Sequence, residues 1–279
     1  MAAAPSASRL LEEPHGVLKK GKAKEEEEEA RDWAELPRDA LLAVFHKLDH
    51  IDILTGPDMV CSPWRRATMD EPELWRRIDM RFHVAEQYPG VLFEMVRAAM
   101  RRSAGRAPSL KSLRLIGCDD IVDSTFKVLI TKFPVLEELE LSNCWHRFPR
   151  TLEVIGDACP LLKRFRLSQR SFYSPRVGDS AAMAMMPELQ SLQLTANSLT
   201  NSGLELILNG CPLLESLDIR SCYHVCMDDD MQAKCSRIRT LRHPEDSMDD
   251  YDLSFDYTIP RPCWSTKPIE YAMSCTSPY

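Results

Sequence analysis

A leucine pattern with a period of about 26 residues limits what this chain can fold into more than any other feature of its sequence. Five segments fit the form L-x-x-L-x-L-x-x-C/N with few substitutions, and each follows a proline at a fixed offset. Repetition at such a period is typical of solenoid architectures. A sixth, decayed copy begins at Ile238. The five full copies span residues 110–118, 136–144, 162–170, 189–197 and 214–222.

Two periodicities alternate inside each unit. The L-x-L alternation has period two, so Leu139 and Leu141 point to one side of a short strand and Glu140 to the other. Between strands the apolar spacing changes to i, i+3, i+4, i+7, which indicates one face of a helix. A unit of one strand and one helix cannot cover its own apolar face, so neighbouring units must stack. The helical positions of the clearest unit are Leu204, Ile207, Leu208 and Cys211.

The pattern resembles the cysteine-containing leucine-rich repeats, with TNSGLELILNGCPLLESLDIRSC (200–222) as the closest match. The resemblance implies an α/β fold in which parallel strands line a concave face and helices cover the convex face. We expect about five to six repeats over residues 108–243.

Composition excludes several classes of protein. The net charge of −7 gives no general attraction to phosphate backbones, so we expect no nucleic-acid partner. No apolar run approaches a membrane span and no secretory signal is evident, which predicts no membrane association and a cytoplasmic and/or nuclear location. The ten cysteines are then expected to stay reduced, and six of them fall at structural positions of the repeat.

Residues 33–77 have a different organisation. An apolar helical stripe follows Pro37, which suits a first helical position. Thr55–Asp58 and Ser62–Pro63 read as two further helix starts, each with a hydroxyl cap and a nearby proline. The sequence therefore predicts a bundle of three short helices, a size at which a lone core is marginal and a partner is expected.

This segment resembles the F-box, through Leu36-Pro37, Leu41-Leu42, Phe45, Leu48, Val60-Cys61, Trp64-Arg65 and Leu74-Trp75. The order of parts is similar to plant-type F-box/leucine-rich-repeat proteins. The resemblance implies binding to a Skp-type adaptor and, through it, to cullin and RING subunits of a ubiquitin ligase. It implies one set of residues that are either adaptor-facing or in the core of the module, namely Leu36, Pro37, Leu41, Leu42, Phe45, Val60 and Trp64.

The remaining segments complete the expected organisation. Residues 1–30 are predicted to be disordered and 31–80 to form the F-box. A linker with a capping helix is expected over 81–107. Residues 244–279 form an acidic tail that is either free or folded back as a cap over Arg166, Arg220 and Arg242.

We find no pattern typical of catalysis, and we expect a chain that is not an enzyme and takes no cofactor. A zinc site built from cysteines and histidines of residues 222–243 does not match any familiar spacing. No phosphate loop, metalloprotease motif or nucleophile elbow is present in the sequence.

Two surfaces are candidates for holding a protein client. The outward positions of successive strands form a column in which opposite charges alternate. These charges can pair within the sheet, select a client, or do both. Aromatic residues just past the strands form the second candidate, with packing on the adjacent repeat as the alternative. The column runs Arg114, Glu140, Arg166, Gln193, Asp218 and Arg242, and the aromatic candidates are Trp145, Phe172, Tyr173 and Tyr223.

These features favour a non-catalytic substrate receptor of an SCF-type ubiquitin ligase, with the F-box on the adaptor and the repeats on an unknown protein client. The alternative is an interaction scaffold that uses its repeats outside any ligase.

Overall fold

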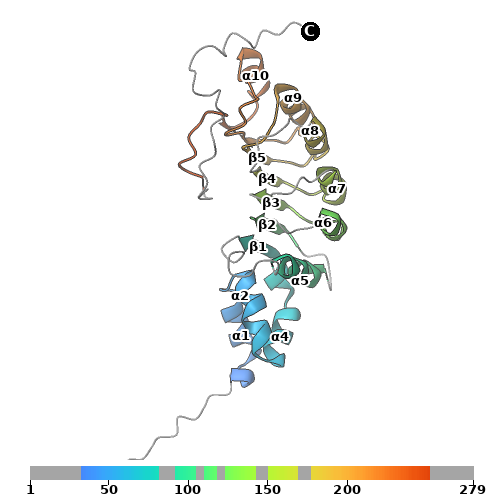
Figure 1. Cartoon of the computed structure of the whole chain (residues 1–279), viewed down its shortest axis with the longest axis vertical. Helices are drawn as coiled ribbons and strands as arrows, with labels where there is room; N and C mark the ends of the chain where they lie inside the picture. The colour runs from blue at the N-terminus through green and yellow to red at the C-terminus, as the bar shows by residue number, and fades with distance from the viewer. Residues whose placement is uncertain are drawn as a thin grey trace, which may run out of the picture. The chain divides into compact units, whose positions relative to one another are not determined.

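The computed structural model describes residues 33–81, 92–104, 110–117, 123–142, 150–168 and 177–251. Its central feature is one parallel sheet with strand order β1-β2-β3-β4-β5-β6-β7, the same as the order in the chain (Figure 1). The strands are β1 (Arg77–Arg81), β2 (Ser112–Ile116), β3 (Glu138–Ser142), β4 (Arg164–Ser168), β5 (Ser191–Thr195), β6 (Ser216–Asp218) and β7 (Thr240–Arg242).

Helices line one face of this sheet. Figure 1 shows α6 to α9 stacked on the same side of the strands, as the alternation of the two periodicities predicts. The helices are α5 (Leu92–Ala104), α6 (Asp123–Ile130), α7 (Thr151–Ala158), α8 (Val177–Met183), α9 (Asn201–Gly210) and α10 (Asp229–Lys234). The predicted fold class, a helical segment followed by an α/β solenoid, is therefore confirmed.

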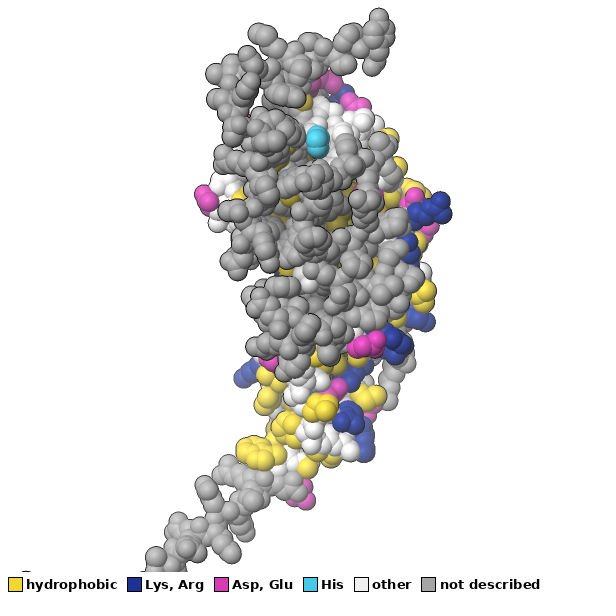
Figure 2. All heavy atoms as spheres, viewed as in Figure 1, with side chains coloured by type: hydrophobic (Ala, Val, Ile, Leu, Met, Phe, Trp, Pro, Cys, Tyr) yellow, Lys and Arg dark blue, Asp and Glu magenta, His cyan; other side chains and the backbone are white. Residues whose placement is uncertain are grey.

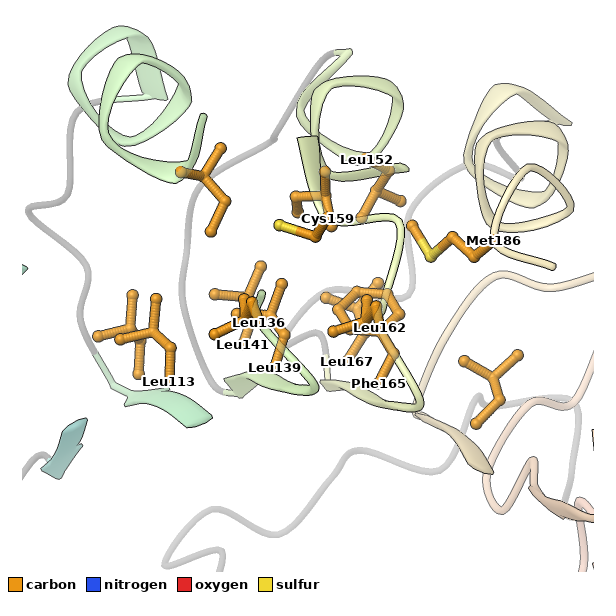
Figure 3. Packing of buried hydrophobic residues seen from close by; sticks show 14 of the residues in the cluster. Leu113, Leu136, Leu139, Leu141, Leu152, Cys159, Leu162, Phe165, Leu167 and Met186 are labelled. Carbon is orange, nitrogen blue, oxygen red and sulfur yellow. The ribbon is translucent and has the colours of Figure 1, made fainter. Parts of the chain in front are cut away.

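The core is a ladder of leucines shared between repeats. In Figure 3, Leu136, Leu139 and Leu141 of one repeat lie beside Leu162 and Leu167 of the next. All are essentially inaccessible to solvent. Full burial of each such side chain contributes roughly 1.5–3 kcal/mol, so the stacked units stabilise one another. The same ladder includes Phe165, where the leucine pattern is interrupted, and Cys159 in front of β4.

The sheet begins one strand earlier than the leucine repeats predict. In β1, Ile78 and Met80 are buried and pair in register with Leu113 and Leu115 of β2. The helix expected to cap the first repeat is present as α5, and Met95, Val96 and Ala99 are buried as its apolar stripe requires. It packs against β1, α6 and the 3-10 helix before β1. β1 and α5 thus form the first repeat of the solenoid. The helical segment packs against this repeat through η2 (Pro72–Trp75) and α2 (His50–Thr55).

The helical segment contains more helices than predicted, and its caps differ. Its elements are η1 (Trp33–Glu35), α1 (Arg38–Phe45), α2 (His50–Thr55), α3 (Pro57–Val60), α4 (Ser62–Met69) and η2 (Pro72–Trp75). Neither expected hydroxyl cap is correct. Thr55 ends α2 and donates its hydroxyl to the carbonyl of Ile51, and Ser62 is already inside α4. The side-chain cap belongs instead to Asp49, which accepts from the amide of Asp52 at 2.8 Å.

Gly56 explains how α2 and α3 follow each other so closely. A Cβ at this position would lie 2.9 Å from the carbonyl oxygen of Asp52, so a larger residue would force the backbone to shift. Proline at the first position of α3 prevents α2 from simply continuing. The Gly56-Pro57 pair therefore divides one helical stretch into two.

Within the described part of the chain, no helix combines the length and the apolarity that crossing a bilayer requires.

Candidate functional site

The predicted column of polar residues lies in register across the sheet. The strands are parallel and each pairing keeps the same offset, so Arg114, Glu140 and Arg166 are direct neighbours on β2, β3 and β4. Gln193, Asp218 and Arg242 continue the column on β5, β6 and β7. β1 adds a member that the repeat pattern does not reveal, Asp79 beside Arg114. We call this set the concave column.

The first half of the concave column neutralises itself. Arg114 donates to Glu140 at 2.7 Å and to Asp79 at 3.2 Å. Arg166 lies 3.6 Å from the other carboxylate oxygen of Glu140. Glu140 is only 5% exposed, so its charge is held by these two arginines rather than by water. The expected pairing of Glu140 with both cross-strand neighbours is confirmed.

The second half depends on a residue outside the column. Arg220 follows β6, is 4% exposed, and binds the Asp218 carboxylate through Nε and Nη2, with Nη2 at 2.8 Å. Arg242 donates to Asp250 at 2.7 Å, and Arg220 also donates to Asp250. The hydrogen bond from Arg220 holds the pKa of Asp250 below its usual value. The charges of β6 and β7 are thus balanced by the segment that follows the last strand.

That segment returns across the concave face. The ring of Tyr251 lies under the guanidinium of Arg166 at 4.4 Å and near that of Arg220 at 5.6 Å. Nε of Arg166 donates to the tyrosine hydroxyl at 3.3 Å, and burial raises the pKa of that hydroxyl. In Figure 1 the coloured part of the chain that follows β7, residues 244–251, lies on the side of the sheet opposite α6 to α9. For residues 244–251 the structure therefore shows the fold-back alternative, and residues 252–279 lie outside the described part.

A second group of charges lies at the N-terminal ends of the strands. An open hollow of about 400 Å³ there is surrounded by both signs of charge. Hydrogen bonds from Lys111 and Lys163 lower the pKa of Glu137, and Arg164 binds Glu138. Each basic side chain of the lining is paired with an acidic one, so the charges around the hollow are engaged with one another. Its lining residues are Glu73, Arg76, Arg77, Lys111, Glu137, Glu138 and Arg164.

The set of residues expected to face an adaptor separates into three groups by burial. Leu41 and Phe45 are 4% and 1% exposed and belong to the core. Trp64 is half-buried, with its ring edge-on to Phe45 at 5.6 Å between centroids. The sequence pattern could not separate core from surface here, because apolar residues of all three groups occur within or next to short helices. The others are Leu36 and Leu42, half-buried, and Pro37 and Val60, exposed.

Large apolar side chains outside the expected set are also exposed on α1, α3 and α4. They are Val44, Met59 and Met69, each more than half exposed. Figure 2 shows hydrophobic side chains on the surface of the helical segment. Where such side chains adjoin one another, an exposed apolar patch marks a protein-binding face.

A buried polar network joins the helical segment to the first repeat. Asp58 of α3 binds Arg102 of α5, with Nη1 at 3.0 Å from Oδ1, and accepts from the hydroxyl of Thr68 at 2.7 Å. Arg102 also lies over the ring of Trp75, 5.0 Å from its centroid. The indole N–H of Trp75 donates to the carbonyl of Thr68 at 2.7 Å. From Leu36 onward, the helical segment and the sheet are therefore parts of one packed body.

The aromatic candidates past the strands are only partly described. Trp145, Phe172 and Tyr173 lie outside the described residues, and Tyr223 is half-buried after β6. Their role in client binding stays a prediction.

The buried cysteines of the repeats, Cys159, Cys211, Cys222 and Cys235, behave as small apolar residues. Burial raises the pKa of Cys159 and of Cys222 to about 12 and that of Cys211 to about 11. The thiol of Cys222 donates to the carbonyl of Leu194 at 3.0 Å, at the bend where the repeat pattern places a small side chain. These thiols therefore stay protonated near neutral pH. Among the described residues no group of three or more histidine, cysteine, aspartate or glutamate side chains is arranged to hold a metal ion.

Comparison with known proteins agrees with this arrangement. The family model described as F-box-like matches residues 33–81, which comprise the helical segment and β1. F-box protein SKIP19 of Arabidopsis thaliana is 36% identical over 251 residues, covering 81% of each chain. Putative F-box/LRR-repeat protein 22 of the same plant is 37% identical, again over 81% of each chain. This chain belongs to the F-box/LRR-repeat family.

The family name fits both parts of the structure. Residues 33–81 are the F-box, and the strands that follow form the leucine-rich repeats. Among solved structures, the leucine-rich repeat-containing protein LegL7 of Legionella pneumophila gives a TM-score of 0.40 at 9% identity, over 74% of this chain and 78% of that one. That likeness is too low to support any argument about function.

Proposed function

We propose that this protein is the substrate-recognition subunit of an SCF-type E3 ubiquitin ligase. In this proposal the F-box docks the Skp-type adaptor, which connects it to cullin and RING subunits, and the leucine-rich repeats bind a protein client for ubiquitination. Membership of the F-box/LRR-repeat family supports the first contact, and the polar concave face of the sheet supports the second.

The observation that carries the proposal is the continuity between the two parts. β1 lies inside the family match for the F-box and is also the first strand of the sheet. The ion pair between the buried Asp58 and the part-buried Arg102 fastens α3 of the F-box to α5 of the first repeat. A partner held at the F-box is therefore held at a fixed position relative to the concave face.

Such rigidity is what a non-catalytic receptor needs. Transfer of ubiquitin to a client becomes effectively intramolecular when both are held in one complex at high effective concentration. The receptor's contribution is then positional, and the bond-forming step belongs to a ubiquitin-loaded enzyme elsewhere in the complex.

The exposed apolar residues of the F-box are the proposed contact with the adaptor. Val60 is 57% exposed at the end of α3, next to the still more exposed Met59. Pro37 is exposed at the start of α1. Leu41 and Phe45 support this face from the core and do not form it.

Val60→Asp tests the contact, and the repeats provide a matched control. Val128 of α6 is 63% exposed, so Val128→Asp makes the same chemical change at similar exposure away from the F-box. A carboxylate buried in an apolar interface is costly, so Val60→Asp should weaken binding of a purified Skp-type adaptor at least about tenfold. Val128→Asp should leave it unchanged. Isothermal titration calorimetry with the full chain measures both.

Failure of the wild-type chain to bind the adaptor would contradict the proposal and leave the alternative of a scaffold that acts through its repeats alone. Equal losses in the two variants would contradict the assignment of the adaptor face.

A further inference from the structure

Alternation of charge along the concave column stops at Gln193. Up to β4 each charged residue has an opposite neighbour, Asp79 with Arg114 and Glu140 with Arg166. On β5 the neutral Gln193 separates Arg166 from Asp218. The chain then contributes Arg220 and Arg242 on the same face, with Asp218 as the only acid of the column there.

Beyond β4 the face therefore carries more arginine than the sheet can neutralise. Arg220 takes up the Asp218 carboxylate through three hydrogen bonds from its side chain. The ion pair described for Arg242 is with Asp250, outside the sheet. We call Arg166, Arg220 and Arg242 the arginine face.

The segment seated on the arginine face is held in two different ways. Its first part is fixed by the backbone, because Ser221 donates its amide to the carbonyl of Pro244 at 2.8 Å and Pro244 is buried. Its last part is held through side chains, Asp250 on Arg220 and Arg242, and Tyr251 on Arg166. One backbone contact, from Nη1 of Arg220 to the carbonyl of Ser247 at 2.7 Å, lies between them.

This arrangement exceeds what a terminal cap requires. A cap has to cover the exposed end of the last repeat at β7. Tyr251 reaches instead to Arg166 on β4, three strands inward and about 14 Å away at the usual strand spacing. The segment thus lies along the inner face, where a leucine-rich-repeat receptor has room for a client.

We propose that the arginine face is a binding site for an acidic peptide that carries an aspartate followed by an aromatic residue, and that Asp250 and Tyr251 occupy it as an internal mimic of that peptide. A client segment displaces the mimic by supplying the same two groups, a carboxylate between Arg220 and Arg242 and a ring beneath Arg166. The identification of the bound peptide as a client rests on the proposed receptor function. The existence of a peptide-binding site on the arginine face does not depend on that function.

The contacts of the mimic suit a reversible occupant. Asp250 and Arg242 are both about half exposed, and ion pairs between exposed side chains are individually weak. The ring of Tyr251 beneath the guanidinium of Arg166 adds a cation–π contact, which only an aromatic side chain at that position can make. A tethered segment of this kind competes at an effective concentration on the order of millimolar, so it lowers the apparent affinity for any peptide added from outside.

A peptide added in trans tests the proposal on the full chain. The probe is a fluorescein-labelled peptide with the sequence PEDSMDDY, identical to residues 244–251, and its binding is followed by fluorescence anisotropy. The double variant D250N/Y251A removes the side-chain contacts of the mimic and opens the site. We expect it to bind the probe at least about tenfold more tightly than the wild-type chain. Adding Arg242→Gln to the double variant should reverse most of that gain.

Asp249→Asn is the matched control, since Asp249 is exposed, neighbours Asp250 and forms no ion pair within the described part of the chain. It changes the net charge as Asp250→Asn does, and it should not tighten probe binding. A probe with asparagine and alanine in place of its last aspartate and its tyrosine should not bind the opened chain.

Probe binding that is equal in the wild-type chain and D250N/Y251A would overturn the proposal, as would equal binding of the substituted probe. Circular dichroism of each variant shows whether the fold is retained, and Arg242→Gln changes only an exposed side chain. The assay contains no adaptor, so its failure is distinct from a failure of the F-box to bind one.

Discussion

The two halves of the concave face balance their charged side chains in different ways. From β1 to β4 the charges alternate and pair with the next strand, and Glu140 is buried between two arginines. From β5 to β7 the alternation is broken and a segment from outside the sheet supplies the balancing carboxylate. The charges of the first half are balanced within the sheet. Those of the second half are balanced only while Asp250 is in place.

The comparison indicates how a repeat sheet can provide a binding site without a cavity. Regular alternation neutralises a column and leaves nothing for a partner to select. A single neutral residue, Gln193, interrupts the alternation, and because Arg220 engages Asp218, Arg242 takes its carboxylate from Asp250, outside the sheet. In the proposed site, specificity would come from this departure from the pattern, while the leucine ladder beneath it continues unbroken.

Charge reversal in the self-paired half should have the largest effect. Glu140→Lys places a third cation between Arg114 and Arg166 at a buried position, and loss of one partner of a buried pair costs about 3 kcal/mol. We expect the free energy of unfolding to fall by about that amount in urea denaturation followed by circular dichroism.

Glu215→Lys is the control for this change. Glu215 is exposed and faces the still more exposed Arg239 at 3.6 Å, so its reversal should change stability little. Similar losses in both variants would show that the half from β1 to β4 gains nothing special from its buried pairing.

Removal of the two anions of Arg220 should have an intermediate effect that is not additive. Asp218→Asn alone leaves Arg220 with Asp250, and Asp250→Asn alone leaves it with Asp218. With both replaced, a guanidinium that is 4% exposed keeps no carboxylate. A double-mutant cycle in urea should therefore show a loss for D218N/D250N larger than the sum of the single losses. Additive losses would mean that the two carboxylates do not share Arg220.

The smallest expected effect is a difference between the two halves in how salt changes their hydrogen–deuterium exchange. At 1 M salt the screening length is about 3 Å, so exposed pairs such as Arg242 with Asp250 weaken far more than the buried Glu140. Hydrogen–deuterium exchange at 0.05 and 1 M sodium chloride should show faster exchange in residues 244–251 and unchanged exchange in β3. An equal response in both segments would contradict the difference drawn between the two halves.

The leucine pattern was sufficient to predict the sheet because it records burial directly. Strands β2 to β6 coincide with the five full copies, and the decayed copy at Ile238 contains β7. β1 was not predicted from the sequence, because its distance from the next strand differs from the repeat period. Ile78 pairs with Leu113, an offset of 35 residues where the repeats keep about 26, and its apolar pair is Ile78 and Met80 instead of two leucines.

The site was predictable only where it follows from the register. The column of Arg114, Glu140 and Arg166 is a direct consequence of stacking equal units. The contacts of Asp58 with Arg102 and of Tyr251 with Arg166 join residues 44 and 85 positions apart, and no local pattern records them. For the acidic segment the sequence showed complementary charge, but it did not show that an aromatic residue would lie among the arginines.

The most direct test of the whole account is a sedimentation-velocity experiment on D250N/Y251A with the labelled PEDSMDDY peptide and a Skp-type adaptor together. The account predicts that the fluorescence moves with a single species containing chain, adaptor and peptide, because the F-box and the arginine face are distinct parts of one packed body. A chain that fails to bind the adaptor, or an adaptor that expels the peptide on binding, would contradict it.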